Sequence, residues 1–263
     1  MLEAIRAAAP ENLQESWDNS GIQILTDPDQ SVYSILTCLE INDDVVREAI
    51  KKKVDLIVTH HPLYFSKLSS VRADNVIGSQ TIDLIRHSIS LYSAHTSFDS
   101  AEYGTNQDLA EKIGLDGIVP MYPSEINPAA GMGRYGIYPK PLPFEEFLQR
   151  VTDVCGKSLI RVAGAAPEQV KKVALCTGAG SEFMEDALTN GADVYLTGDV
   201  KYHEARHACD LGMCVIDAGH YGTEVLFAEN MAVLLRNRLG DEVEILVSET
   251  DINPFVTDRE QYG

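Results

Sequence analysis

The stretch Val54–His61, with the sequence VDLIVTHH, contains a short apolar run that ends directly before two histidines. Residues 55–59 have the length and the β-branched composition of a buried strand. Runs of the same kind occur upstream at 35–40 (ILTCLE) and downstream at 89–94 (ISLYSA). The chain up to residue 100 therefore contains three expected strands, separated by segments long enough for helices.

Helical patterns fill those segments. Asn42 is a suitable N-cap, and the apolar positions within 45–50 fall on one face of the helix that would follow it. Glu48 and Lys52 add an i,i+4 ion pair on the same helix. A second helix is expected over 80–87. Strands that alternate with helices in this way predict a mostly parallel α/β sheet.

The second half of the chain repeats the pattern in the same order. Residues 173–177 (VALCT) match the first strand, 192–197 (ADVYLT) match 54–59, and 213–218 (MCVIDA) match 89–94. Any two α/β units share some of these features, so the alternative is a pair of unrelated lobes. We predict two structurally similar α/β lobes with mostly parallel sheets and the active site between them, because ligands bind beyond the strand ends of open α/β sheets.

Prolines and glycines punctuate residues 122–143, which we interpret as a crossing between lobes followed by a strand over 133–138. An amphipathic helix is expected over 144–154. A further helix, capped by Ser181, is expected to end at Gly191. The predicted division assigns residues 1–125 and 228–263 to the first lobe and residues 126–227 to the second.

Composition excludes several classes of protein. Lys and Arg total 21 against 40 Asp and Glu, which gives a net charge of −19 and disfavours binding to nucleic acid or an anionic membrane. No apolar run approaches the ~20 residues of a membrane span, and the first residues do not resemble a signal peptide. The five cysteines are scattered and form no CxxC pair, and Cys38 and Cys176 lie in strand-like runs. We expect reduced thiols and a cytoplasmic location.

Histidines and carboxylates gather just past the expected strands. His60 and His61 follow the second strand, His95 follows the third with Asp99 four residues on, and His220 follows the equivalent strand of the second half with Glu224 four residues on. A single histidine at a strand end is usually structural. Several imidazoles with carboxylates are the natural ligands of a catalytic divalent metal, and one shared carboxylate would allow two ions.

Other polar features have two interpretations. His203–His207 (HEARH) fits the H-E-x-x-H pattern of zinc proteases. The ordinary interpretation is a helix over 203–211 that ends at Gly212. His203 lies near enough to the end of the preceding strand to reach a pocket. The turn Gly178–Ser181 suits either an anion or a tight strand-to-helix connection. Lys201 is a candidate partner for a phosphate or carboxylate, and Asp199 is a candidate helix cap.

Five motifs together resemble the NIF-three-like family, also called GTP cyclohydrolase I type 2. They are Trp17–Gln23 (WDNSGIQ), Thr59–Pro62 (THHP), Ala94–Thr96 with Asp99, Thr197–His203 (TGDVKYH), and Asp217–Tyr221 with Thr223 and Glu224. The resemblance spans nearly the whole chain in the family's order. It departs from the family at Ser97-Phe98, where a less bulky apolar residue is expected and the shape of the pocket is affected.

The resemblance implies two divalent metal ions per chain, with zinc, iron and manganese as the candidates, between two α/β lobes. His60 and His220 would bind one ion, His61 and Asp99 the other, and Glu224 would bridge both. His95 would contact the metal ligands without binding an ion itself. His95 and His203 are the candidate catalytic residues for proton transfer. The resemblance also implies a homohexamer. We expect a small-molecule substrate, and the acidic composition predicts no nucleic acid or membrane partner.

The family name suggests hydrolytic opening of the purine ring of GTP with loss of formate. Few basic residues lie near the motifs, although a triphosphate is strongly anionic. Two alternatives therefore remain: a metal-dependent nucleotide or phosphoester hydrolase, and a metal-binding regulatory protein without turnover.

Overall fold

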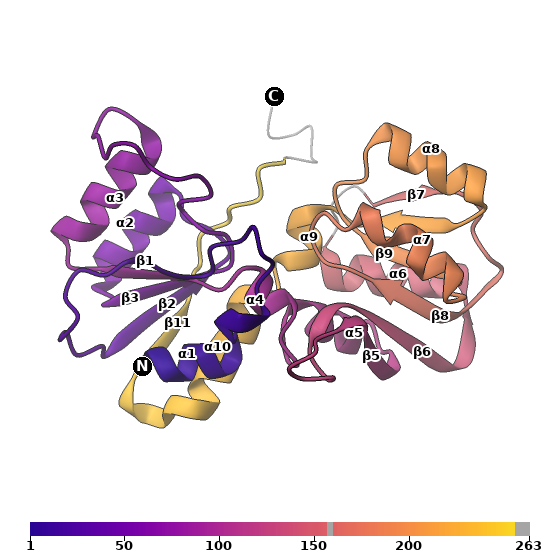
Figure 1. Cartoon of the computed structure of the whole chain (residues 1–263), viewed down its shortest axis with the longest axis horizontal. Coiled ribbons are helices and arrows are strands. Elements are labelled where there is room, and N and C mark those ends of the chain that lie inside the picture. The colour runs from indigo at the N-terminus through magenta and orange to yellow at the C-terminus, as the bar shows by residue number, and fades with distance from the viewer. Residues whose placement is uncertain (157–159, 256–263) are drawn as a thin grey trace. The chain divides into compact units, whose positions relative to one another are not determined.

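The computed structural model describes residues 1–156 and 160–255, and these form two compact units (Figure 1). The first unit contains Met1–Gly104 and Phe227–Ile252, and the second contains Thr105–Leu226 with the described residues from Asn253 onward. Residues 105–125 thus lie in the second unit and not, as predicted, in the first. The reason is pairing: residues 116–123 form a strand of the second sheet.

The first unit is built on a five-stranded sheet, in the order β1-β4-β3-β2-β11. Its strands are β1 (Gly21–Ile24), β2 (Ser34–Cys38), β3 (Leu56–Thr59), β4 (Ser90–Ser93) and β11 (Glu244–Val247). All neighbours are parallel except β1, which runs antiparallel to β4. The helices α2 (Asp43–Lys52) and α3 (Val76–Arg86) cover one face, and α1 (Leu2–Ala8) and α10 (Phe227–Leu239) cover the other (Figure 1).

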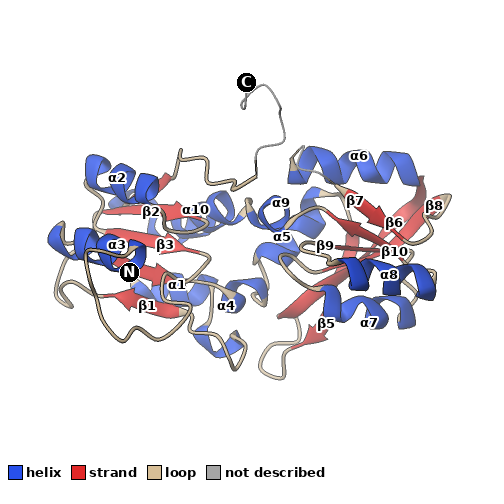
Figure 2. Ribbon diagram, turned by 90° about the horizontal axis from the view of Figure 1, so that it is seen from above, coloured by secondary structure: helices blue, strands red, loops and turns tan. Residues whose placement is uncertain are grey.

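The second unit has a six-stranded sheet, in the order β5-β6-β8-β9-β10-β7. Its strands are β5 (Asp116–Pro123), β6 (Gly131–Pro143), β7 (Arg161–Ala163), β8 (Gln169–Leu175), β9 (Val194–Thr197) and β10 (Cys214–Asp217). Alternate side chains of the central strands enter two cores. One core contains residues of α5 (Thr105–Lys112) and α6 (Phe144–Cys155), and the other contains residues of α7 (Met184–Thr189) and α8 (Tyr202–Leu211) (Figure 2).

The predicted mostly parallel character holds for the first sheet but not for the second. Only β8, β9 and β10 are mutually parallel there. The strand β6 is antiparallel to both of its neighbours, and β7 is antiparallel to β10. The second sheet is mixed because the β5–β6 hairpin at one edge and β7 at the other both add antiparallel pairs, and the prolines of β5 are tolerated on an edge strand, where an amide donor is not needed.

The internal repeat is confirmed by topology and by hydrogen bonds. The strands β2, β3 and β4 lie side by side in the first sheet as β8, β9 and β10 do in the second. At equivalent positions, Asp55 accepts from the amides of Tyr33 and Ser34, and Asp193 accepts from the amides of Lys171 and Lys172. Asp55 thus fastens the start of β2, and Asp193 fastens the middle of β8, so both copies use an aspartate to hold the neighbouring strand.

Several expected local features are confirmed. The side chain of Asn42 caps α2 by accepting from the amide of Val45 at 2.8 Å. Cys38 and Cys176 are buried in the two units. Ser181 is not a cap, because it begins a short 3₁₀ turn, Ser181–Phe183, that precedes α7. Within residues 1–156 and 160–255, no helix is long and apolar enough to cross a membrane.

Glu48 ties α2 to the segment that follows β11. Its carboxylate accepts from Lys52 Nζ at 2.7 Å, from the Ser248 and Thr250 hydroxyls at 2.6 and 2.8 Å, and from the amide of Glu249 at 3.0 Å. Burial acts to raise the pKa of Glu48, but these hydrogen bonds outweigh it and lower the pKa to about 2. The predicted ion pair is therefore one part of a larger anchor.

We expect Glu48→Gln to destabilise the protein by about 1–2 kcal/mol at pH 7, because it removes charge-assisted hydrogen bonds. A lowered folded-state pKa stabilises the protein above the unfolded-state pKa, and this contribution disappears as the pH falls towards 2. The difference in urea unfolding free energy between the unaltered protein and Glu48→Gln should therefore shrink below about pH 4. Glu146→Gln, which breaks an exposed pair with Arg150, is the control. Its unfolding free energy should differ little from that of the unaltered protein at neutral or acidic pH.

Candidate metal centre

Four predicted site residues of the first unit lie together, and we call them the histidine cluster: His60, His61, His95 and Asp99. His60 and His61 directly follow β3, His95 follows β4, and Asp99 ends the short helix α4 (Thr96–Asp99). One ring nitrogen from each histidine lies within 4.8 Å of the others. His60 Nε2 is 3.6 Å from Asp99 Oδ1. The parallel strands β3 and β4 are neighbours, which is why residues 35 positions apart converge at their carboxyl ends.

The imidazoles are held through their Nδ1 atoms. His60 Nδ1 lies 3.0 Å from the carbonyl oxygen of Ala94, and His95 Nδ1 lies 2.9 Å from Asp18 Oδ1. Since a carbonyl and a carboxylate only accept hydrogen bonds, each Nδ1 carries the proton. A neutral ring then has its lone pair on Nε2. This arrangement, with one nitrogen donating to an oxygen behind it, is typical of histidines that bind metals.

Asp18, which the sequence analysis did not single out as a site residue, fixes His95. Besides His95, it accepts from the Ser20 hydroxyl at 2.8 Å and from the amide and hydroxyl of Thr96 at 3.1 and 2.6 Å. Burial acts to raise the pKa of Asp18, but the hydrogen bonds prevail and hold that pKa well below its usual range. Asp18 therefore stays ionised and holds His95 in one orientation.

His220 and Glu224 form a second donor pair, in the second unit. They stand one turn apart on α9 (His220–Glu224), as predicted, and His220 Nε2 is 3.0 Å from Glu224 Oε2. Asp199 Oδ2 accepts from His220 Nδ1 at 2.8 Å. Asp199 is thus a positioning residue and does not cap α8, whose N-cap is Lys201. Its backbone has φ of 54°, a conformation that aspartate tolerates better than most residues.

The turn after β8 makes room for Glu224. Gly178 donates its amide to the Thr223 hydroxyl at 2.9 Å, and Gly180 donates its amide to the Thr197 hydroxyl at 3.0 Å. Because both glycine amides already have partners, the structure favours a tight connection over an anion site. A Cβ atom on Gly178 would lie 2.3 Å from Glu224 Oε1.

We expect Gly178→Ala to weaken metal binding by at least tenfold with little loss of secondary structure. The new methyl group would displace the Glu224 carboxylate, and alanine is strained at the φ of +67° found here. Metal content after dialysis, with a circular dichroism spectrum, measures both effects. Gly191→Ala is a matched control, because its φ is +71° and its Cβ would meet nothing within 4 Å. Equal metal loss in both variants would contradict the role of Gly178.

The other candidates lie on or near α8. His203 is exposed, with its ring 5.2 Å from that of Tyr202, and its predicted catalytic role stays a prediction. Glu204 accepts from the amide of Lys201 and thereby caps the helix, while His207 pairs with Glu185 at 2.7 Å. In the part of the chain that the structure describes, neither histidine of the HEARH sequence joins a three-donor group.

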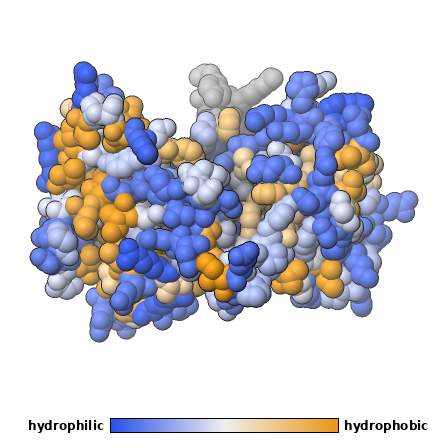
Figure 3. Space-filling model, viewed as in Figure 1, coloured by the Kyte–Doolittle hydropathy of each residue, from blue (hydrophilic) through white to orange (hydrophobic). Residues whose placement is uncertain are grey.

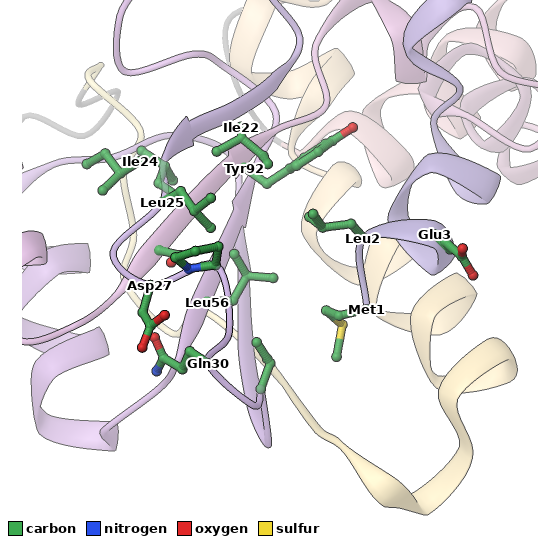
Figure 4. Close-up of a pocket in the computed structure, with 14 residues that line it drawn as sticks. Met1, Leu2, Glu3, Ile22, Ile24, Leu25, Asp27, Gln30, Leu56 and Tyr92 are labelled. Atoms are coloured by element: carbon green, nitrogen blue, oxygen red, sulfur yellow. The ribbon is translucent and has the colours of Figure 1, made fainter.

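Phe98, where the sequence departs from the family pattern, is fully buried and packs edge-on against Phe227 at 5.1 Å. The bulky ring therefore fills the core of the first unit. Another feature of this unit is a cavity of about 330 Å³ beside β1, lined mainly by apolar residues of α1, β1, β3 and β4, with the polar side chains of Glu3, Asp27 and Gln30 also at its wall (Figure 4). It contains none of the predicted metal ligands.

The donor geometry fits divalent metal ions. Ligands about 2.0–2.2 Å from an ion lie roughly 3.0–3.6 Å from one another. The 3.0 Å between His220 Nε2 and Glu224 Oε2, two donors that the family resemblance assigns to one shared ion, matches this range. Imidazole nitrogens and carboxylate oxygens suit zinc, iron and manganese, so the donors do not single out one of them.

The fold and these donors define an α/β protein of two related units that carries candidate histidine and carboxylate metal ligands. The sequence model of the family Duf34/NIF3 (NGG1p interacting factor 3) matches residues 1–254. The chain therefore belongs to the DUF34/NIF3 family, as its motifs suggested.

Similar proteins extend over nearly the whole chain. A Clostridium perfringens protein called GTP cyclohydrolase 1 type 2 homolog is 34% identical over 255 residues, which cover 97% of each chain. A Streptococcus pneumoniae protein of the same name is 35% identical over 262 residues, also 97% of each. Among solved structures, the Staphylococcus aureus hypothetical protein SA1388 superposes with a TM-score of 0.90 at 27% identity, covering 98% of this chain and 97% of that one.

Proposed function

We propose that this chain is a metal-dependent hydrolase that binds two divalent ions and acts on a nucleotide, with opening of the GTP purine ring as the leading reaction. The proposed ligands are His60, His61, Asp99, His220 and Glu224. The observation that carries the proposal is the fixed orientation of His60 and His95, whose Nδ1 atoms are both committed to oxygens. The name shared by the bacterial relatives supports the choice of GTP.

The number of donors supports shared ions. His220 and Glu224 supply two donors, and catalytic ions commonly take three protein ligands. We therefore propose that this pair completes the coordination of ions that the histidine cluster holds. A divalent ion in such a site supplies a water molecule whose pKa is lowered towards neutrality and a positive charge for phosphate oxygens.

The protein's own groups would then handle protons. His95 presents Nε2, which can take a proton while the Asp18 carboxylate stabilises the resulting imidazolium through Nδ1. Asp199 holds His220 in the same way. The net charge of −19 opposes the binding of a free triphosphate, so phosphate binding depends on the ions rather than on lysines or arginines.

The decisive experiment incubates metal-loaded protein with a panel of nucleotides and identifies the products by mass spectrometry. Formate release from GTP supports the cyclohydrolase, and phosphate release from several nucleotides supports the phosphoester hydrolase. If two ions bind and no nucleotide changes, the hydrolase proposal is wrong and a metal-binding regulatory protein is the better account.

We also propose that the chain forms a homohexamer. Its resemblance to the family suggests this, and apolar side chains exposed on or before α3 support assembly: Val71, Val76 and Ile85 are 48%, 66% and 52% exposed. Hydrophobic residues gather over this region in Figure 3. Light scattering should give about six times the 28.9 kDa chain mass. A stable monomer at micromolar concentration would contradict the proposal.

A further inference from the structure

Two exposed aromatic rings stand beside the histidine cluster. Trp17 and Phe65 are 63% and 65% exposed, and their ring centroids are 6.3 Å apart. Each ring meets His95 edge-on with a centroid distance of 5.8 Å. Large aromatic side chains normally gain free energy by burial, so a pair left open next to candidate metal ligands suggests a surface that a ligand covers.

The backbone under both rings is fixed within the first unit. Trp17 directly precedes Asp18, which accepts four hydrogen bonds. Phe65 directly follows Tyr64, whose carbonyl accepts from Asn19 Nδ2 at 2.7 Å and whose amide donates to Gln23 Oε1 at 3.3 Å. The loops that carry the two rings are therefore joined to each other. Binding a ligand there would require little ordering of the backbone.

We propose that Trp17 and Phe65 form a stacking surface for the base of a nucleotide whose phosphates or reacting atoms reach the metal centre. This inference rests on the proposed function and adds two binding residues to it. The rings are tilted by 37° and 6.3 Å apart, too close to hold a base between them, so the base lies on one ring with its edge towards the other. Stacking recognises a base through its flat face and does not require positive charge, which suits this acidic chain.

Trp17 is the only tryptophan in the chain, so its fluorescence reports on this surface directly. We expect guanosine 5′-monophosphate to quench that fluorescence saturably in metal-loaded protein. Ribose 5-phosphate at the same concentration should not, because it lacks a base. Phe65→Leu should raise the Kd for the nucleotide about 5- to 100-fold, the usual effect of losing one stacking partner. Phe65→Tyr keeps the ring and should bind within about twofold of the unaltered protein.

A matched control removes an exposed aromatic ring elsewhere in the same unit. Tyr33 is 69% exposed, and Tyr33→Leu should leave the Kd unchanged. The proposal is overturned if no nucleotide quenches saturably or if ribose 5-phosphate quenches equally. It is also overturned if Trp17 emission shifts with protein concentration alone, which would assign the surface to contacts between copies. Metal content measured on the same samples tests the proposed metal site separately, so failure of the stacking surface is distinguishable from failure of the proposed function.

Discussion

Glu224→Gln is expected to reduce the metal content of the purified protein from the proposed two ions per chain to one or none. Glutamine keeps the shape of the side chain but removes the negative charge and one strong donor oxygen. Two divalent cations held ~3.5–4 Å apart repel each other strongly, and a bridging carboxylate offsets that repulsion. Asp99→Asn, which affects a proposed ligand of a single ion, should lose mainly one ion and retain the other.

Elemental analysis of both variants after dialysis measures this difference. Glu185→Gln is a suitable control, because Glu185 is an exposed carboxylate in the same unit whose partner is the surface residue His207. If Glu224→Gln retains two ions with unchanged affinity, Glu224 is not a bridge. Glu224 would then be a general acid or base, consistent with its near-complete burial beside His220.

Asp18→Asn is expected to disable His95 while leaving the fold intact. Three donors converge on Asp18 Oδ2, from Ser20 and Thr96, so the asparagine oxygen must keep that place. The amide nitrogen then faces His95 Nδ1 and turns it into an acceptor. His95 must move its proton to Nε2 and loses the lone pair with which it would accept a proton. Turnover of whichever nucleotide the panel experiment identifies as the substrate should fall by about 100-fold or more.

Two further measurements separate this effect from simple damage. Nitrogen NMR of the histidine rings should show the change of tautomer at His95. The unfolding free energy of Asp18→Asn at pH 7 should be about 1.5–3 kcal/mol lower than that of the unaltered protein, which is the usual contribution of a hydrogen bond to a charged group. Because the folded-state pKa of Asp18 is lowered, this difference should persist at pH 5 and decline only below about pH 4. Asp44→Asn, at an exposed carboxylate, should change neither measurement.

The central strands were predictable because each is a continuous apolar run. The predicted strands at 35–40, 55–59 and 89–94 are confirmed as β2, β3 and β4, and their counterparts are confirmed as β8, β9 and β10. The edge strands β1, β7 and β11 were not predicted. They are short and partly exposed, so the hydrophobic pattern that marks a buried strand is weak in them. The start of the second unit was misplaced for the same reason, since much of β5 is exposed.

The proposed ligands were predictable because each follows a strand whose end is visible in the sequence. Their supporting residues were not. Asp18 acts on His95 from 77 residues away, and Asp199 acts on His220 from 21 residues away. Neither distance corresponds to a helical or strand period, so only the tertiary fold brings these pairs together. The motif that contains Asp18 was recognised as a family feature, but its sequence gave no sign that it would orient a histidine.

The first unit is assembled from two separate lengths of chain, and this has a consequence for synthesis on the ribosome. Its sheet needs β11, and the Thr37 hydroxyl in β2 donates to the carbonyl of Ala228 in α10. Those residues emerge only after Thr105–Leu226 has left the exit tunnel. Until then, the nascent first unit has an open sheet edge along β2, and the face that α10 covers has only α1 on it. Thr105–Leu226 carries all six strands of the second sheet and can therefore fold during translation before the first unit, which closes only when Phe227–Ile252 has emerged.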